Sequence, residues 1–199
     1  LLVNKDDALE TTLYIGGAGI TRNNPDYLAV QVINTFFGGK FTSWMNNELR
    51  IKSGLTYGAG SYFDYNQKTG SFIISTHTAN ATTQATIDKA LEVINRLHTQ
   101  AIDEETLSSA KNYMIGMSPP QYQSTDQLAG LLLRMFWYGF DESYINNFEA
   151  NVNAITVAKA NEIIANYNRQ LATDPRLESL IIPLTRGHVD GLGVTVVRS

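Results

Sequence analysis

The chain has 199 residues, of which 43% are hydrophobic and 17% charged, the composition of an ordinary globular protein. Its 15 basic and 19 acidic residues give a net charge of −4, and no basic cluster stands out. This argues against nucleic acid as a partner, because phosphate binding needs concentrated positive charge. No apolar run approaches the roughly 20 residues that cross a bilayer, so no membrane span is expected. The absence of cysteine excludes disulfides and thiolate zinc sites.

The length is that of one domain. We expect residues 1–199 to form a single unit whose core buries roughly 70% of the surface of the unfolded chain. The first residue is Leu1 and not an initiator methionine, so we expect the chain to be a fragment of a longer or processed protein. The absence of a targeting segment therefore carries little information about the compartment.

The N-terminal part predicts a strand followed by a buried helix. Residues 11–20 alternate between apolar and other side chains, and we expect Gly16, Gly17 and Gly19 to close the strand. Residues 26–37 place apolar side chains at four-residue spacing, which is the pattern of a helix packed against a core.

The stretch from Gly38 to Tyr65 is the one around which we expect the rest to be organised. Its first half predicts a helix with an apolar face made of Phe41, Trp44, Met45 and Leu49. Gly54 stands where a helix needs a left-handed closing residue. From Leu55 the period changes to two, which predicts a strand. This pattern places Arg50 at a helix end and Tyr57 early on a strand.

The rest of the chain predicts a hairpin followed by several helices. Residues 71–78 form a second strand, joined to the first by a five-residue turn in a β-hairpin. The chain then becomes helical, with Asp103 and either Ser124 or Thr125 as N-caps. Two apolar runs after Leu177 are expected to be strands. This order predicts an α+β fold, in which helices cover one face of a mostly antiparallel sheet.

No self-contained catalytic centre is visible in the pattern. His77, His98 and His188 have no partner histidine three or four residues away, and neither His-Glu-x-x-His nor its inverse occurs. We therefore expect no metal site in this chain. The glycine clusters lack the spacing of phosphate-binding loops. Phe136, Trp137 and Tyr138, beside Met135, are expected to pack in the core.

Three short motifs within residues 20–63 belong together. They consist of Arg22, Pro25, Asp26 and Tyr27; Phe37, Gly38, Gly39, Phe41 and Ser43; and Leu49, Arg50, Lys52, Gly54, Leu55 and Tyr57. In this combination they resemble the second, non-zinc-binding half of the pitrilysin-type zinc peptidases, which include insulysin and the mitochondrial processing peptidase. The pair Trp44-Met45 stands where the family commonly has Arg-Leu, and we expect this to affect local packing only. Weaker similarity continues to about Tyr167, and residues 168–199 match nothing.

The resemblance implies a division of labour between two homologous halves. The family binds zinc through an inverted His-x-x-Glu-His motif on the first half, so zinc is expected in a partner domain, on the same chain or on a separate subunit. The two halves enclose an extended peptide. The resemblance implies that Arg50 and Tyr57 bind this peptide, and that Tyr57 stabilises the oxyanion in trans to the zinc. Both residue types suit these roles, because a guanidinium and a phenol are hydrogen-bond donors.

The function implied is therefore that of the substrate-binding, non-zinc half of a zinc metalloendopeptidase, corresponding to its C-terminal half and inactive alone. Some relatives have lost peptidase activity and serve as structural subunits, so a proteolytically inactive scaffold or partner subunit is an alternative. A third alternative is an unrelated α+β binding module. Without the resemblance, Arg50 would be read as a solvated cation at a helix end and Tyr57 as strand packing. The absence of cysteine, together with the resemblance to the many bacterial two-domain zinc proteases of this family, favours a bacterial periplasmic or secreted enzyme.

Overall fold

The computed structural model describes residues 9–173, 177–182, 185–186, 188–189 and 192–197. Strands and longer helices alternate with short π-helical and 3₁₀ segments. The elements are β1 (Glu10–Ala18), α1 (Tyr27–Asn34), a π-helical segment (Thr35–Gly39), α2 (Trp44–Asn46), a second π-helical segment (Asn47–Lys52), β2 (Ala59–Tyr65), β3 (Gly70–Ala79), a 3₁₀ turn (Asn80–Thr82), α3 (Thr83–Thr99), α4 (Glu104–Gly116), a 3₁₀ turn (Pro119–Tyr122), α5 (Thr125–Tyr138), α6 (Ser143–Asn146), α7 (Phe148–Asn153), α8 (Val157–Thr173), β4 (Leu177–Ile182), β5 (Thr185–Arg186), β6 (His188–Val189) and β7 (Leu192–Val197).

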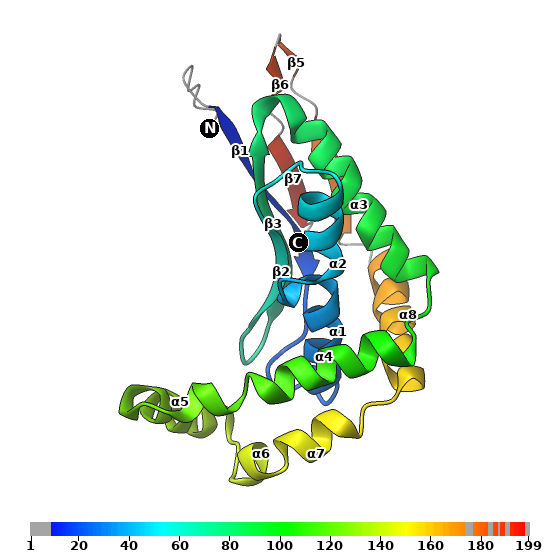
Figure 1. The fold of residues 1–199 in the computed structure, drawn as a ribbon. Helices are drawn as coiled ribbons and strands as arrows, with labels where there is room; N and C mark the ends of the chain where they lie inside the picture. Colours follow the sequence, from blue (N-terminus) through cyan, green and yellow to red (C-terminus); the bar gives the residue numbers. More distant parts are fainter. Residues whose placement is uncertain (1–8, 174–176, 183–184, 187, 190–191, 198–199) are drawn as a thin grey trace.

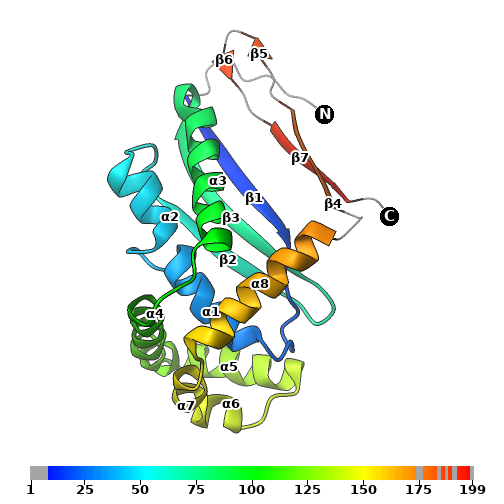
Figure 2. The same ribbon diagram turned by 90° about the vertical axis from the view of Figure 1, so that its right-hand side faces the viewer.

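The fold is α+β, as the sequence predicts. An antiparallel sheet in the order β1-β3-β2 is covered on one face by α1, α2, α3 and α8, while α4 to α7 lie at one end (Figures 1 and 2). None of the helices within the described residues is both long and apolar enough to span a bilayer.

The sheet alternates as a half-covered sheet should. Leu13 pairs with Thr76, which also pairs with Ala59, and all three are buried beneath the helices. The next rung carries the exposed Tyr14 opposite Ser75. Alternation with period two thus sends one set of side chains into the core and the other to the helix-free face.

The core is built mainly from the segments that the helical periodicity indicates. Its most completely buried large side chains are Phe36, Phe37, Met45, Leu49, Ile74 and Leu107. The helix predicted at 26–37 is present as α1 and its π-helical extension. The side chains of Asp103 and Ser124 cap α4 and α5 by accepting hydrogen bonds from backbone N–H groups, as predicted, and Gln127 completes a capping box with Ser124.

Several boundaries differ from those predicted. Gly16 and Gly17 lie inside β1, opposite Ile73 and Phe72, instead of closing the strand. The strand predicted to begin at Leu55 is β2, which begins at Ala59. β3 begins at Gly70, one residue before its predicted start, so the turn between β2 and β3 has four residues, one fewer than predicted. Two apolar runs of the tail pair as the antiparallel strands β4 and β7, which agrees with their predicted strand character.

The prediction that Phe136 and Trp137 pack in the core is wrong. Their side chains are 85% and 60% exposed, although the neighbouring Met135 is buried. The reason is the position of α5, which extends away from the sheet at the end of the molecule (Figure 1). Within the described residues, α5 has little to pack against, so only one narrow stripe of the helix is covered.

Candidate functional site

Arg50 and Tyr57 lie side by side. Arg50 belongs to the second π-helical segment, and its guanidinium carbon is 4.7 Å from the centre of the Tyr57 ring. The ring of Phe41 lies 4.8 Å from the same carbon. The cation is thus in contact with two aromatic rings, an arrangement that attracts it electrostatically and restricts its orientation. Sequence reasoning pairs Arg50 with Tyr57 and misses the part played by Phe41, which it assigns to the apolar face of a helix.

This cluster of Phe41, Arg50 and Tyr57 faces solvent. Tyr57 and Phe41 are 77% and 61% exposed, so both rings are open to a bound molecule. Within the described part of the chain, the Arg50 guanidinium makes no hydrogen bond or ion pair, and the Tyr57 hydroxyl makes no hydrogen bond. Their donors are therefore available to a bound molecule.

The loop that presents Tyr57 is tied at several points. Gly54 adopts φ +61°, the left-handed conformation expected for it, and the Leu55 N–H donates to the Leu49 carbonyl at 2.9 Å. The Thr56 hydroxyl donates to the Gly58 carbonyl at 2.9 Å and accepts from the Gly58 N–H at 3.1 Å. These bonds close residues 54–58 into a tight turn whose outward side chain is Tyr57.

Two threonines of β3 hold the same loop to the sheet. The Thr76 hydroxyl lies 3.0 Å from both the Thr56 hydroxyl and the Gly58 carbonyl, and its single proton is shared between these two acceptors. The Thr78 hydroxyl donates to the Leu55 carbonyl at 2.6 Å. Each buried hydroxyl is therefore used to fix the backbone on either side of Tyr57.

Asn46 is a buried residue that the sequence analysis does not single out. Its amide nitrogen donates to the Phe41 carbonyl at 2.7 Å, and its amide oxygen accepts from the Ala59 N–H at 3.2 Å. One side chain thus connects the backbone that carries Phe41 with the start of β2, two residues after Tyr57. The only sequence signal for this role is a polar side chain next to Met45, on the helical stretch that also carries the buried Leu49.

Gly38 allows the helical layer to approach β2 closely. A Cβ at this position would come within 2.1 Å of the Ser61 Oγ and 2.5 Å of the Ser61 nitrogen. The Ser61 hydroxyl in turn donates to the Asn34 side-chain oxygen at 2.6 Å, while the Asn34 amide donates to the Ser61 carbonyl at 3.0 Å. The close packing of the helical layer against β2 therefore requires a residue without a side chain at position 38.

Trp44, which stands where the family commonly has arginine, is packed locally. Its ring lies against Phe36, with centroids 5.2 Å apart, and the Arg96 guanidinium carbon is 4.0 Å from its centre. Arg96 also reaches Glu48 at 3.7 Å, and Glu48 pairs with Lys52 at 2.7 Å. These contacts connect α3 to the second π-helical segment, on which Arg50 lies.

The described residues do not form a metal centre. No three His, Asp or Glu side chains in that part of the chain lie close enough together to hold an ion. Partial burial lowers the pKa of His98. The zinc of the pitrilysin-type peptidases therefore does not fit the residues that the structure describes.

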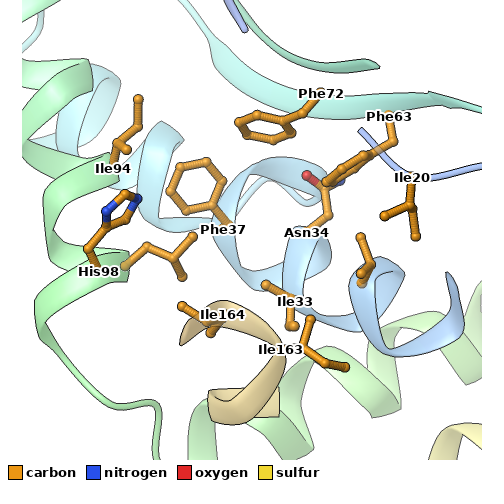
Figure 3. A pocket seen from close by; sticks show the side chains of 12 residues that line it. Ile20, Ile33, Asn34, Phe37, Phe63, Phe72, Ile94, His98, Ile163 and Ile164 are labelled. Carbon is orange, nitrogen blue, oxygen red and sulfur yellow. The ribbon is translucent and has the colours of Figure 1, made fainter. Parts of the chain in front are cut away.

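A small apolar pocket lies between the sheet and the helices. It has a volume of about 100 Å³, and Figure 3 shows Phe63 and Phe72 of the sheet facing Phe37, Ile94 and Ile164 across it. Its polar lining is limited to Asn34, already hydrogen-bonded to Ser61, and His98. This volume lies below that of ordinary ligand pockets, so we regard it as a gap in the core.

Known proteins share both the sequence motifs and the fold. The family described as "Peptidase M16 inactive domain" matches residues 1–114. A comparison with curated proteins finds no match. Among solved structures, the peptidase M16 inactive domain from Pseudomonas fluorescens is similar with a TM-score of 0.73 and 29% identity, over 80% of this chain and 38% of that one.

Two more distant structures share the fold. One is a chain of Complex III2 from Candida albicans, with a TM-score of 0.68 and 19% identity over 81% of this chain and 41% of that one. The other is the periplasmic protease PqqL from Escherichia coli, with a TM-score of 0.64 and 17% identity over 79% of this chain and 18% of that one. The chain thus spans less than half the length of each of these proteins. Because the family match covers more than half of its residues, the chain belongs to the M16 peptidases, as an inactive domain of that family.

Proposed function

We propose that this chain is the substrate-binding, non-zinc half of a pitrilysin-type zinc metalloendopeptidase. The observation behind the proposal is the cluster of Phe41, Arg50 and Tyr57, in which a half-buried cation lies beside an exposed phenol, both without hydrogen-bond partners among the described residues. A structural role would not require two large aromatic side chains to stay in solvent. A ligand that covers them would account for their exposure.

In this proposal the two polar groups act on a bound peptide. The planar guanidinium of Arg50 donates to peptide carbonyls, and contact with two rings holds it in a restricted orientation. The Tyr57 hydroxyl donates to the carbonyl oxygen that gains negative charge as the peptide bond is attacked. Donors that are already in position at such an oxygen stabilise the transition state more than the ground state. The tight turn of residues 54–58 supplies that positioning.

The metal and the attacking group belong to another domain in this proposal. Residues 1–199 would be the C-terminal half of a two-domain peptidase, paired with a homologous zinc-binding domain on the same chain or on a separate subunit. The length of the similar solved chains, of which this chain covers 38% or 18%, is consistent with a further domain. The likeness to a periplasmic protease supports a periplasmic or secreted location.

The experiment uses the complete enzyme, in which the zinc-binding partner domain is present. Replacing Tyr57 by Phe removes the hydroxyl and keeps the ring against Arg50. We expect kcat to fall by about 100- to 1,000-fold, which is the usual cost of losing one oxyanion donor. The denaturation midpoint should stay within the error of the measurement, because the hydroxyl makes no hydrogen bond among the described residues.

The matched control is Tyr14→Phe, which removes an exposed phenol on the sheet at a position outside the cluster. Its kcat should equal that of the unmodified enzyme. An unchanged kcat in Tyr57→Phe would refute the role of Tyr57. A loss of equal size in both variants would show that the effect is not specific to the cluster.

A scaffold function is the second candidate. The structural likeness to a chain of Complex III2 favours it, because that chain lies in a large assembly. If the chain is a scaffold, the partner domain would lack the inverted zinc motif. The complex would then have no peptidase activity for Tyr57→Phe to lower, and the variant could change only the binding of a partner. Reading the sequence of the partner domain distinguishes the two functions before any assay is made.

A further inference from the structure

A second cavity lies at the end of the molecule, remote in sequence from the Arg50 cluster. It has a volume of about 420 Å³ and opens between the start of α1, the last turn of α4 and the helices α6 and α7. This volume falls within the range of roughly 300–1,000 Å³ that small-molecule sites occupy. The cavity is therefore large enough for a small molecule that consists of an aromatic ring and several further heavy atoms.

Arg22 lies in the wall of this cavity and is buried to an unusual degree. Its side chain and backbone together are only 8% exposed. The guanidinium carbon is 3.7 Å from the centre of the Tyr27 ring, 4.8 Å from that of Phe140 and 5.3 Å from that of Tyr144. An aromatic cage of this kind partly offsets the cost of removing a cation from water, but it supplies no negative charge.

The cation has no counter-ion among the residues that the structure describes. Its one side-chain hydrogen bond is from Nη2 to the Tyr144 hydroxyl, at 2.7 Å, and it forms no ion pair. A guanidinium carries five N–H donors, so most of them are unused. No fully enclosed side-chain nitrogen or oxygen of the described residues lacks a partner. The unused donors of Arg22 must therefore reach accessible space, and the cavity is the space that Arg22 lines.

The lining of the cavity carries a positive charge. Among the described residues that line it, Arg22 alone is charged, although the whole chain has a net charge of −4. The remaining wall combines apolar and aromatic side chains, among them Met114, Met117 and Phe148, with tyrosines and amides. Burial raises the pKa of Tyr27, and the positive charges of Arg22 and Arg134 only reduce this rise. The phenol is therefore protonated at neutral pH and can donate a hydrogen bond. Its oxygen accepts from the Gln31 amide at 3.3 Å.

From this geometry we infer a binding site for a monocarboxylate with an apolar body, in which the carboxylate pairs with Arg22 and the body fills the cavity against Met114 and Met117. A carboxylate matches the two-pronged donor pattern of a guanidinium, and a bound anion would supply the charge that the buried cation lacks. The same chemistry is offered by the C-terminus of a peptide with an aromatic last residue and by a free aromatic acid. The site is independent of the proposed function, because it shares no residue with the Arg50 cluster.

Three probes test the chemistry on the chain as it stands. N-acetyl-L-phenylalanine carries the carboxylate, the ring and a peptide-like amide; its amide derivative lacks the charge; 3-phenylpropionate lacks the amide group. By titration calorimetry at pH 7.5, we expect the first to bind at least tenfold more tightly than its amide derivative. Equal binding of 3-phenylpropionate would identify a free acid as the natural class, and weaker binding would identify a peptide C-terminus. Equal binding of the acid and its amide, or no binding of either, overturns the inference.

The four methionines provide an internal control for the location. In a chain with ¹³C-labelled methionine methyl groups, the acid should shift the signals of Met114 and Met117, which line the cavity, and leave those of Met45 and Met135 unchanged. Shifts confined to Met45 or Met135, or no shifts at saturation, would place the ligand elsewhere and contradict the site.

Two variants separate Arg22 from general charge effects. Arg22→Gln should abolish the preference for the acid over the amide. Arg134→Gln removes an exposed cation close enough to influence Tyr27 and should change the affinity less than twofold. An Arg22→Gln variant that folds and keeps the preference overturns the inference. If this variant fails to fold, the comparison of acid with amide and the methyl shifts still decide the question on the unmodified chain.

Discussion

The side-chain oxygen of Asn46 accepts a hydrogen bond from the Ala59 backbone N–H at 3.2 Å and so fixes the point at which the Tyr57 loop joins the sheet. The other end of the same amide holds the Phe41 carbonyl. One buried side chain therefore connects the backbone of Phe41 with the strand that follows Tyr57. The exposed cluster is supported by polar contacts beneath it and not by its own packing.

The first prediction concerns Asn46→Ala. This change leaves the buried Ala59 N–H without its acceptor, which costs about 1–3 kcal/mol. It also removes the donor to the Phe41 carbonyl, which is only partly buried. We expect a lower urea midpoint with an unchanged m-value. The control is Asn47→Ala, whose amide donates to the Thr42 carbonyl at an exposed position and should cost less than about 0.5 kcal/mol. Equal losses in the two variants would contradict the bridging role of Asn46.

The second prediction concerns the glycine that lets the helical layer meet β2. In Gly38→Ala, the new methyl group would collide with the backbone nitrogen of Ser61, which cannot move away as a flexible side chain could. We expect a loss of about 1–3 kcal/mol in thermal or urea unfolding, as for other overpacked sites. Gly17→Ala is the matched control, because a Cβ there meets nothing within 4 Å. A neutral Gly38→Ala variant would show that the layers can separate without cost.

The third prediction concerns Phe41, which sequence reasoning places on the apolar face of a helix. Phe41→Leu keeps an apolar side chain of similar size but removes the ring beside the Arg50 guanidinium. A cation–π contact at an exposed site is worth about 0.5–1 kcal/mol, so KM of the complete enzyme should rise by about two- to fivefold with little change in kcat. Loss of stability in place of this change in KM would mean that Phe41 is a packing residue after all.

The fourth prediction concerns pH. Burial lowers the pKa of His98 below its usual value, so the unfolded chain binds this proton more readily than the folded one. Stability contributed by the neutral imidazole is therefore complete above the ordinary pKa of histidine, near 6.5, and is lost as the pH falls through that value and below. Urea midpoints between pH 7.5 and 5 should decline less steeply in His98→Phe, whose ring suits the apolar pocket. An identical decline would assign the pH dependence to other groups.

Much of the fold could be read from the sequence because the signals are local. The period of two places the side chains of β1 and β3 on alternate faces, and the spacing of three and four places α1 and α4 against the core. Asp103 and Gly54 act within their own turn, as an N-cap and a left-handed residue. Helical spacing could not show that Phe136 is exposed, because the spacing of apolar residues indicates only that a helix has an apolar side. Whether anything covers that side depends on where α5 lies.

The sequence by itself determined the α+β class, the hairpin, the capping residues and the seven-residue spacing of Arg50 and Tyr57, since each depends on neighbours along the chain. Only the tertiary structure decided which side chains meet. It places Phe41 against Arg50, makes Asn46 a bridge between two loops, and leaves Arg22 as a caged cation at a cavity 28 residues away from Arg50 in the sequence. These contacts join segments that share no local pattern. Their geometry follows from how the sheet and the helices pack, which no short stretch of sequence records.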